Sequence, residues 1–354
     1  MKKFLLALLS LTVITANVSI ADDHAPADTK AVLVTGATSG IGRATAELLA
    51  SNGYLVYAGA RKDKDMEELN KIKNITAVRL DVTKQDQIDS AVKMISDQGH
   101  GLWGLVNNAG VNVVAPMTIA DEGDLDFLFQ VNVYGVFRVT QAFAPMILES
   151  KGRIINISSI SGVITGPGYG MYGGTKHALE AFTDSTMMEL QPFGVHVAAV
   201  NPGNFASEIG LTRCKRLIKK RGETNWGRFE ERRQQMIDSC EERLKEGVAG
   251  EGTPPDAVAR TVQQALFEDN PRERYLVVPR QREAGWTVST AIEDVLRFNN
   301  GHEHSYARDE LVELLDKLWP YYSGEKSRQN EEDAEALRSF MQTWMTRGES
   351  ESDQ

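Results

Sequence analysis

The chain has 354 residues, of which 42% are hydrophobic and 25% charged, as is ordinary for a soluble globular protein with a sizeable core. The length exceeds that of a typical single domain and suits one large α/β domain with additions. A net charge of −10 argues against nucleic acid as a partner. The two cysteines, Cys214 and Cys240, are too few for a disulfide framework or a cysteine-rich metal site. They could form one bridge, but we expect two unpaired thiols.

The N-terminal segment differs from the rest of the chain. Lys2 and Lys3 precede an apolar run over 4–18, and small residues ending at Ala21 follow it. This order is typical of a bacterial-type secretory signal, so we expect residues 1–21 to be a signal peptide and the protein to be periplasmic or secreted. The alternatives are an uncleaved membrane anchor, for which the run is short, and a cytoplasmic protein if the segment is not a signal.

From residue 29 onward, strand-like and helix-like segments alternate. The strand patterns fall at 31–35, 54–59, 75–80, 102–106, 153–157, 195–200 and 274–278. The helical patterns between the first six strands fall at 41–51, 63–71, 85–98, 121–149 and 169–188. Strands separated by helices of this length imply parallel βαβ units. The fold class predicted for 29–285 is therefore α/β, a Rossmann-type doubly wound parallel sheet of about seven strands with helices on both faces.

Two segments do not follow this alternation. Residues 204–250, a charged and helical stretch after the sixth strand, form an insertion that we interpret equally as a solvated surface excursion or as a lid over a pocket. Residues 286–354 are predicted to be a C-terminal helical extension, with apolar residues spaced along 311–318. Its acidic end at 349–354 is expected to be frayed.

A glycine-rich turn follows the first strand. Gly36, Gly40 and Gly42, with Ser39 and Ile41 between them, stand where the strand passes into a helix. Glycines there let the backbone approach a pyrophosphate, which meets free N–H groups at the helix N-terminus. A glycine cluster at the first strand of an α/β chain is a strong sign of dinucleotide binding.

The end of the second strand bears on the choice of nucleotide. Arg61 and Lys62 follow it, and the strand tip carries no carboxylate. An arginine suits the 2′-phosphate of NADP(H), whereas an acid would bind the ribose hydroxyls of NAD(H). NADP(H) is therefore the predicted cofactor. NAD(H) stays possible, because Asp63 or Asp65 could bind a ribose instead.

Further polar and small residues follow other strands at what should be the same edge of the sheet, where ligands bind in open α/β folds. An acid after the third strand would meet the adenine, and the loop at 107–110 would lie near the nicotinamide ribose. The candidate cofactor-binding residues at these strand ends are Asp81, Val82, Asn108, Ala109, Gly110, Pro202 and Gly203.

A tyrosine and a lysine lie four residues apart on the helical pattern at 169–188. This spacing places Tyr172 and Lys176 on one face of the helix. A nearby ammonium group should lower the pKa of the phenol from about 10 toward the working pH. Ser159 precedes Tyr172 by 13 residues and could share a substrate oxygen with it. Asn132, inside the predicted helix at 121–149, is unfavourable there unless it faces water or has a function.

With these residues in this order, the sequence resembles the short-chain dehydrogenase/reductase superfamily, densely over 35–203 and loosely over 254–279. The resemblance implies that Tyr172 is the catalytic acid/base and that Lys176 lowers its pKa and binds the cofactor ribose. It also implies that Ser159 stabilises the substrate oxygen and that Asn132 belongs to a proton relay. The stretches 102–110 and 201–205 look most like those of retinol, hydroxysteroid and hydroxybutyrate dehydrogenases.

The predicted function is therefore that of an NAD(P)(H)-dependent oxidoreductase that interconverts a secondary alcohol and a ketone or aldehyde. Five apolar residues near the catalytic positions would line a pocket for a lipophilic small molecule. They are Val163, Ile164, Met171, Phe205 and Ile209. The alternatives are a non-catalytic dinucleotide-binding sensor or scaffold, and a dehydratase or epimerase of the same superfamily.

The expected partners follow from the same resemblance. Family members imply a homodimer or homotetramer formed through the long helices at 121–149 and 172–191. A membrane partner is expected only if residues 1–21 are not cleaved. His302 and His304 lie in a polar stretch and are expected to be surface residues, so no metal is predicted.

Overall fold

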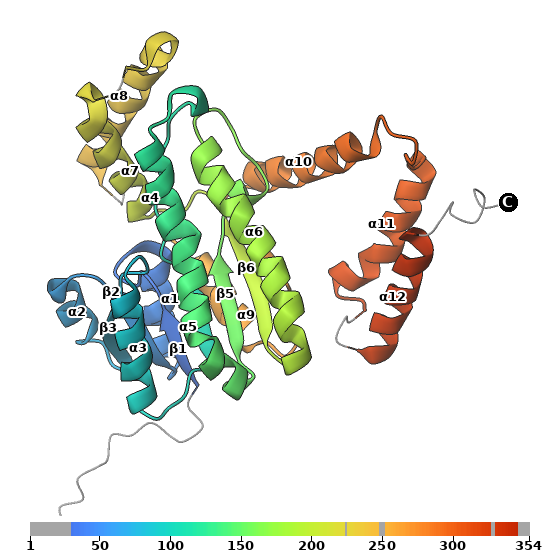
Figure 1. Cartoon of the computed structure of the whole chain (residues 1–354), viewed down its shortest axis with the longest axis horizontal. Helices are drawn as coiled ribbons and strands as arrows, with labels where there is room; N and C mark the ends of the chain where they lie inside the picture. Colours follow the sequence, from blue (N-terminus) through green and yellow to red (C-terminus); the bar gives the residue numbers. More distant parts are fainter. Residues whose placement is uncertain (1–29, 224, 248–251, 327–329, 346–354) are drawn as a thin grey trace, which may run out of the picture.

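The structure is a computed structural model that describes residues 30–223, 225–247, 252–326 and 330–345 (Figure 1). The expected signal at 1–21 and the acidic end at 349–354 lie outside the described residues.

The centre of the molecule is a parallel sheet. Its order is β3-β2-β1-β4-β5-β6-β7, and every neighbouring pair is parallel. The strands are β1 (Ala31–Val34), β2 (Leu55–Ala60), β3 (Ile75–Arg79), β4 (Gly104–Asn107), β5 (Arg153–Ile157), β6 (His196–Pro202) and β7 (Arg274–Val277). The strand order reverses between β1 and β4, which is the topological switch point where such sheets bind ligands. The predicted fold class is confirmed.

Helices cover both faces of the sheet (Figure 1). On one face lie α1 (Gly40–Ser51), α2 (Asp63–Leu69) and α9 (Asp256–Phe267). On the other lie α3 (Gln85–Asp97), α4 (Glu122–Asn132), α5 (Tyr134–Ser150) and α6 (Gly170–Leu190). Each layer buries its own apolar cluster against the strands, which are apolar on both sides as parallel strands are. Short 3₁₀ turns lie at Met117–Ile119, Ile160–Gly162, Gln191–Phe193, Lys220–Gly222 and Gly227–Phe229.

The single helix predicted over 121–149 is wrong in one respect, because the structure divides it into α4 and α5. Val133, between them, has φ −119° and ψ −68°, far from regular helical values. Asn132 is consequently the last residue of α4 and not a mid-helix residue. The break lets its side chain bind a neighbouring loop, as described below.

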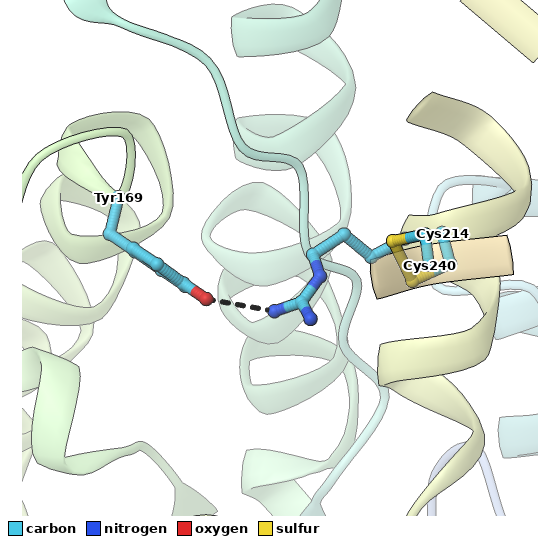
Figure 2. Close-up of a disulfide and its surroundings, with 4 residues drawn as sticks. Tyr169, Cys214 and Cys240 are labelled. Atoms are coloured by element: carbon cyan, nitrogen blue, oxygen red, sulfur yellow. Dashed lines mark hydrogen bonds between the residues drawn. A yellow bond between two sulfur atoms is a disulfide. The ribbon is translucent and has the colours of Figure 1, made fainter. Parts of the chain in front are cut away.

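The insertion at 204–250 contains two helices joined by a disulfide bond. Cys214 on α7 (Glu208–Lys219) is bonded to Cys240 on α8 (Glu230–Glu246), with 5.1 Å between their Cα atoms (Figure 2). The expectation of two unpaired thiols is therefore wrong. The two cysteines are 26 residues apart, and only the packing of α7 against α8 brings them together.

The insertion is not an isolated excursion, because it packs against the sheet domain. Cys214 and Cys240 belong to one buried cluster with Met171 and Tyr172 of α6. A second contact is ionic. Arg216 Nε of α7 lies 2.8 Å from Asp124 Oδ1 of α4, and Nζ of Lys220, directly after α7, lies 2.9 Å from the same oxygen. The insertion therefore covers the region around the start of α6.

The C-terminal extension leads away from the sheet domain (Figure 1). It comprises α10 (Gln281–Asn299), α11 (Arg308–Ser323) and α12 (Glu331–Met345), so the predicted boundary at 286 falls inside α10. Glu283 and Thr287 are buried at the start of α10, whereas Ile292 and Phe298 are 56% and 81% exposed. The extension thus adds little to the core of the domain. Within the described ranges, no helix is long and apolar enough to cross a membrane.

Candidate active site

The glycine-rich turn has the backbone shape that a phosphate cradle requires. Gly36 and Gly40 have φ values of +64° and +54°, which residues other than glycine rarely adopt. A Cβ atom on Gly42 would lie 2.3 Å from Asn108 Nδ2, so the close approach of the two loops needs a glycine there. Ser39 is the N-cap of α1, and among the described residues its side chain makes no capping hydrogen bond. The first amides of α1 thus fit a bound pyrophosphate.

Thr35 and Asn108 hold the turn after β1 against the loop after β4. The Thr35 hydroxyl accepts hydrogen bonds from the backbone N–H groups of Asn108 and Ala109, each at 3.0 Å. The Asn108 side chain donates to the carbonyl oxygens of Thr35 and Gly36, at 2.9 and 3.2 Å. These bonds join the two strands on either side of the switch point. Asn108, Ala109 and Gly36 therefore come together as predicted, and Thr35 was not predicted.

Tyr172 and Ser159 meet at the same edge of the sheet. Tyr172 lies in the first turn of α6 and is only 9% exposed. Ser159 follows β5 and forms a side-chain hydrogen bond with it. The Ser159 hydroxyl also accepts from the backbone N–H of Ser161 at 3.0 Å, which fixes its orientation. Two hydroxyl groups from different elements thus lie close together, so one oxygen of a ligand could accept from both.

Lys176 lies one turn beyond Tyr172 and is buried. Its Nζ donates to the carbonyl oxygen of Ile157 at 2.8 Å, and it lies 5.8 Å from the centre of the Tyr172 ring. A Cβ atom added to Gly110 would be 4.0 Å from the same Nζ. The ammonium group is therefore placed between the end of β5, the phenol and the loop after β4.

Asn132 binds the backbone of the same loop. Its Oδ1 accepts from the N–H of Val111 at 2.8 Å, and its Nδ2 donates to the Val111 carbonyl at 2.9 Å. The Nδ2 also donates to the hydroxyl of Thr175, next to Lys176, at 3.1 Å. Asn132 is 1% exposed, so this side chain is a fully hydrogen-bonded junction between α4, α6 and the loop after β4.

Glu180 is a residue of this site that sequence reasoning missed. It is buried, and its Oε1 accepts from Asn201 Nδ2 at 2.6 Å while its Oε2 accepts from Arg274 Nε at 3.0 Å. Burial lowers the pKa of Lys176, and the negative charge of Glu180 partly offsets this effect. The spacing of Tyr172, Lys176 and Glu180 at four-residue steps on one helix face could have indicated it.

The remaining predicted residues lie at the expected strand ends. Arg61 is exposed directly after β2. Asp81 follows β3, and its Oδ1 accepts from the backbone N–H and the hydroxyl of Thr83 at 3.0 and 2.7 Å. Val82 beside it is buried, and a Cβ atom added to Gly135 would meet it at 2.6 Å.

Pro202 ends β6, and the neighbouring Gly203 lies where β6 meets the C-terminal extension. The Gly203 N–H donates to the Val277 carbonyl at 2.8 Å. A Cβ atom on Gly203 would lie 2.1 Å from Glu283 Oε2 of α10, and that oxygen accepts from the N–H of Asn204 at 2.8 Å. The carboxylate of Glu283 thus anchors the loop after β6 to α10.

The pKa values of the tyrosine and the lysine contradict one part of the sequence interpretation. Burial raises the pKa of Tyr172 to about 12, although the hydrogen bond from Ser159 and the positive charge of Arg213 lower it. Burial lowers the pKa of Lys176 to about 8, and the charge of Glu180 partly offsets this. The phenol therefore keeps its proton at neutral pH, because removal from water disfavours the charged form of each group.

A family model described as short chain dehydrogenase matches residues 30–216, which is more than half of the chain. The chain belongs to the short-chain dehydrogenase/reductase superfamily. It is 35% identical over 265 residues to a mitochondrial D-beta-hydroxybutyrate dehydrogenase of Bos taurus, covering 71% of this chain and 77% of the relative. It is 33% identical over 270 residues to 17-beta-hydroxysteroid dehydrogenase type 6 of Homo sapiens, covering 73% of this chain and 81% of the relative.

Solved structures agree with this assignment. A short-chain dehydrogenase from Streptomyces avermitilis is 25% identical, with a TM-score of 0.60 over 84% of this chain and 99% of that one. The structure of ElxO with NADP bound is also 25% identical, with a TM-score of 0.56 over 71% and 96%. As a member of the short-chain dehydrogenase/reductase superfamily, the protein is an NAD(P)(H)-dependent oxidoreductase of alcohols and carbonyl compounds. Among the described residues, no group of three or more histidine, cysteine or acidic side chains could hold a metal ion.

The depressed pKa of Lys176 predicts that stability rises with pH. The unfolded side chain has a pKa of 10.5 and the folded one about 8, so the unfolded state binds more protons between these values. The free energy of unfolding of the wild type should therefore increase by roughly 2 kcal/mol between about pH 8 and 9.5. The Lys176→Met variant should lack this increase. Urea unfolding of both proteins across this range measures it, below the pH at which Tyr172 contributes with the opposite sign. A constant difference between the two proteins would contradict the burial of a charged ammonium.

Proposed function

We propose that the protein transfers a hydride between NADP(H) and the carbon of a secondary alcohol or ketone, with Tyr172 as the acid/base. The observation that carries this proposal is the meeting of the Tyr172 and Ser159 hydroxyls at the carboxyl edge of the sheet, beside the loop after β4. The nicotinamide, when bound, supplies or accepts the hydride. Tyr172 gives its proton to the substrate oxygen during reduction and takes one back during oxidation.

The other three predicted residues support this proton transfer. Ser159 donates to the same substrate oxygen and stabilises the charge that develops on it. Lys176, which carries its proton at neutral pH, offers that charge to the cofactor ribose and the phenol. Asn132 holds the Val111 backbone and the hydroxyl of Thr175, so it fixes the loop along which water could carry a proton onward.

The preference for NADP(H) is supported by the residues around β2. Arg61 is exposed at the strand tip, where the 2′-phosphate would lie. Asp63, one of the two acids that could bind a ribose instead, forms an ion pair with Arg79. The guanidinium of Arg79 also donates to the carbonyl oxygen of Arg61 at 2.7 Å. Asp63 is therefore paired with Arg79, and the positive charge of Arg61 remains at the tip of β2.

We also propose a homodimer or homotetramer formed through α4, α5 and α6. Two of these helices expose large apolar side chains, since Phe137 on α5 is 53% exposed and Met188 on α6 is 63% exposed. These exposed side chains support an interface on this face, since apolar patches on a surface are typical of interaction sites. Light scattering of the purified protein tests the proposal, and a monomeric mass would contradict it.

Export through residues 1–21 remains our proposal for localisation. The disulfide between Cys214 and Cys240 supports it, because such bonds persist in oxidising compartments such as the periplasm. Mass spectrometry of the protein recovered from cell fractions tests it. An intact N-terminus on cytoplasmic protein would contradict it.

Replacing the phenol should stop the chemistry but not the binding. Tyr172→Phe removes the transferable proton, so turnover should fall at least about a thousandfold, within the range of acid/base catalysis. NADPH affinity, measured by fluorescence titration, should change by less than about threefold, because the ring that packs in the site is retained. Tyr321→Phe, on α11 away from the site, is the matched control. Substantial residual turnover by Tyr172→Phe would show that Tyr172 is not the acid/base.

Removing the positive charge at the tip of β2 should weaken the binding of NADPH and leave the binding of NADH almost unchanged. Arg61→Ala should weaken NADPH binding at least about tenfold, since a charge-assisted bond to the 2′-phosphate is lost. NADH binding should change little. Lys64→Ala, on the exposed face of α2, controls for the loss of one positive charge nearby. Dissociation constants for both nucleotides decide the matter, and equal losses would show that Arg61 does not bind the 2′-phosphate.

A further inference from the structure

An open cavity, lined largely by exposed side chains, lies beside the start of α6, between that helix and the two helices of the insertion. Its volume is about 660 Å³, in the range of sites for small molecules. Tyr169, the N-cap of α6, forms one side. Cys214 and Cys240, whose disulfide is drawn in Figure 2, lie in the wall of the cavity.

The charges lining this cavity are mainly positive. Arg213, Arg228, Arg232 and Arg243 line it, against one acid, Glu231. A guanidinium group is charged at every physiological pH and binds carboxylates and phosphates through paired hydrogen bonds. A chain with a net charge of −10 therefore gathers an excess of positive charge around this cavity. Such a lining fits an anionic ligand.

Arg213 connects the cavity to the candidate catalytic residues. Its guanidinium donates to the Tyr169 hydroxyl at 3.0 Å, the bond marked by a dashed line in Figure 2. Tyr169 lies three residues before Tyr172, one helical turn away. Tyr172 packs in the same buried cluster as Cys214, and the charge of Arg213 lowers the pKa of its phenol. Tyr172 does not line the cavity itself, but Arg213 and Cys214 connect the cavity to it.

The disulfide holds the arginines on both helices in place. Arg213 directly precedes Cys214 on α7, and Arg243 follows Cys240 by three residues on α8. Both cysteines are buried. The bond thus links the two helices that carry these charged groups.

The apolar residues that were expected to line a substrate pocket do not line this cavity. Ile164, Met171 and Phe205 are less than 10% exposed and pack in the protein interior. None of the five predicted apolar residues is among those that line this cavity. The cavity beside Tyr169 is thus bordered mainly by cations, and this lining favours an anionic ligand over a purely lipophilic one.

We propose that the cavity binds an anionic group, a carboxylate or a phosphate, on the substrate whose alcohol or carbonyl carbon reaches Tyr172. This inference rests on the proposed function, since it identifies the chemical class of that substrate. The anion lies among the arginines of α7, of α8 and of the 3₁₀ turn at Gly227–Phe229, and the neutral reacting end extends toward α6. The insertion then selects the substrate, while the sheet domain holds the cofactor.

Paired compounds test the proposal. A series of 3-oxo acids is compared with the methyl esters of the same acids, and a phosphorylated ketone with its dephosphorylated form, so that carboxylate and phosphate are distinguished. In wild type, kcat/KM should favour the anionic member of at least one pair. Arg213→Gln and Arg228→Gln should each reduce that preference at least about tenfold, as expected for one lost charge-assisted hydrogen bond. Arg260→Gln, an exposed arginine of α9, is the control and should keep the preference.

The ratio within each pair separates binding of the anion from effects on the phenol, because a change at Tyr172 alters both members equally. If the anion and its neutral counterpart respond alike in both variants, the proposal is wrong although turnover persists.

A second measurement does not need turnover. The anionic compound should raise the melting temperature of wild type and of Arg260→Gln, and should fail to do so for Arg228→Gln. If no compound is reduced but the melting temperatures still follow this pattern, the proposed reaction is wrong and the proposed anion site is supported. No stabilisation of wild type by any anion of the series would overturn the site itself.

Discussion

The buried ammonium group of Lys176 is the constraint on which the geometry of the site depends. An ion in the protein interior is tolerated only where partners replace its hydration. Lys176 finds them in the Ile157 carbonyl of β5 and in the charge of Glu180. Glu180 in turn accepts from Asn201 of β6 and Arg274 of β7. Helix α6 therefore cannot slide along the sheet without leaving a buried charge unpaired, and this holds Tyr172 next to Ser159.

The same burial sets the protonation of the two groups in opposite directions. It raises the pKa of Tyr172 to about 12 and lowers that of Lys176 to about 8, since both shifts favour the neutral form. At neutral pH the phenol holds the proton that a carbonyl substrate requires, and the lysine keeps most of its charge. The cation that lowers the phenol pKa is Arg213, which belongs to the insertion. The insertion thus contributes to the electrostatics of the candidate acid/base.

Local sequence signals predicted the features that depend on local spacing. The glycines after β1 mark the turn because Gly36 and Gly40 need positive φ, and the four-residue step from Tyr172 to Lys176 defines a helix face. Features that depend on packing between distant segments were missed or wrong. The disulfide needs α7 and α8 to lie side by side, and the break at Val133 accompanies the bonds between Asn132 and Val111. The pKa of Tyr172 depends on burial, which spacing along a helix does not reveal.

Net charge and local charge lead to different conclusions about ligands. A total of −10 disfavours nucleic acid, which meets a large part of a protein surface. At physiological ionic strength, however, charges act over about 8 Å, so a small ligand inside a cavity responds mainly to the groups lining it. Around the cavity beside Tyr169 those groups are four arginines and one glutamate. An acidic protein can therefore take an anionic substrate, provided that one element gathers cations locally. Here that element is the disulfide-bonded pair α7 and α8, which lies outside the sheet that binds the dinucleotide.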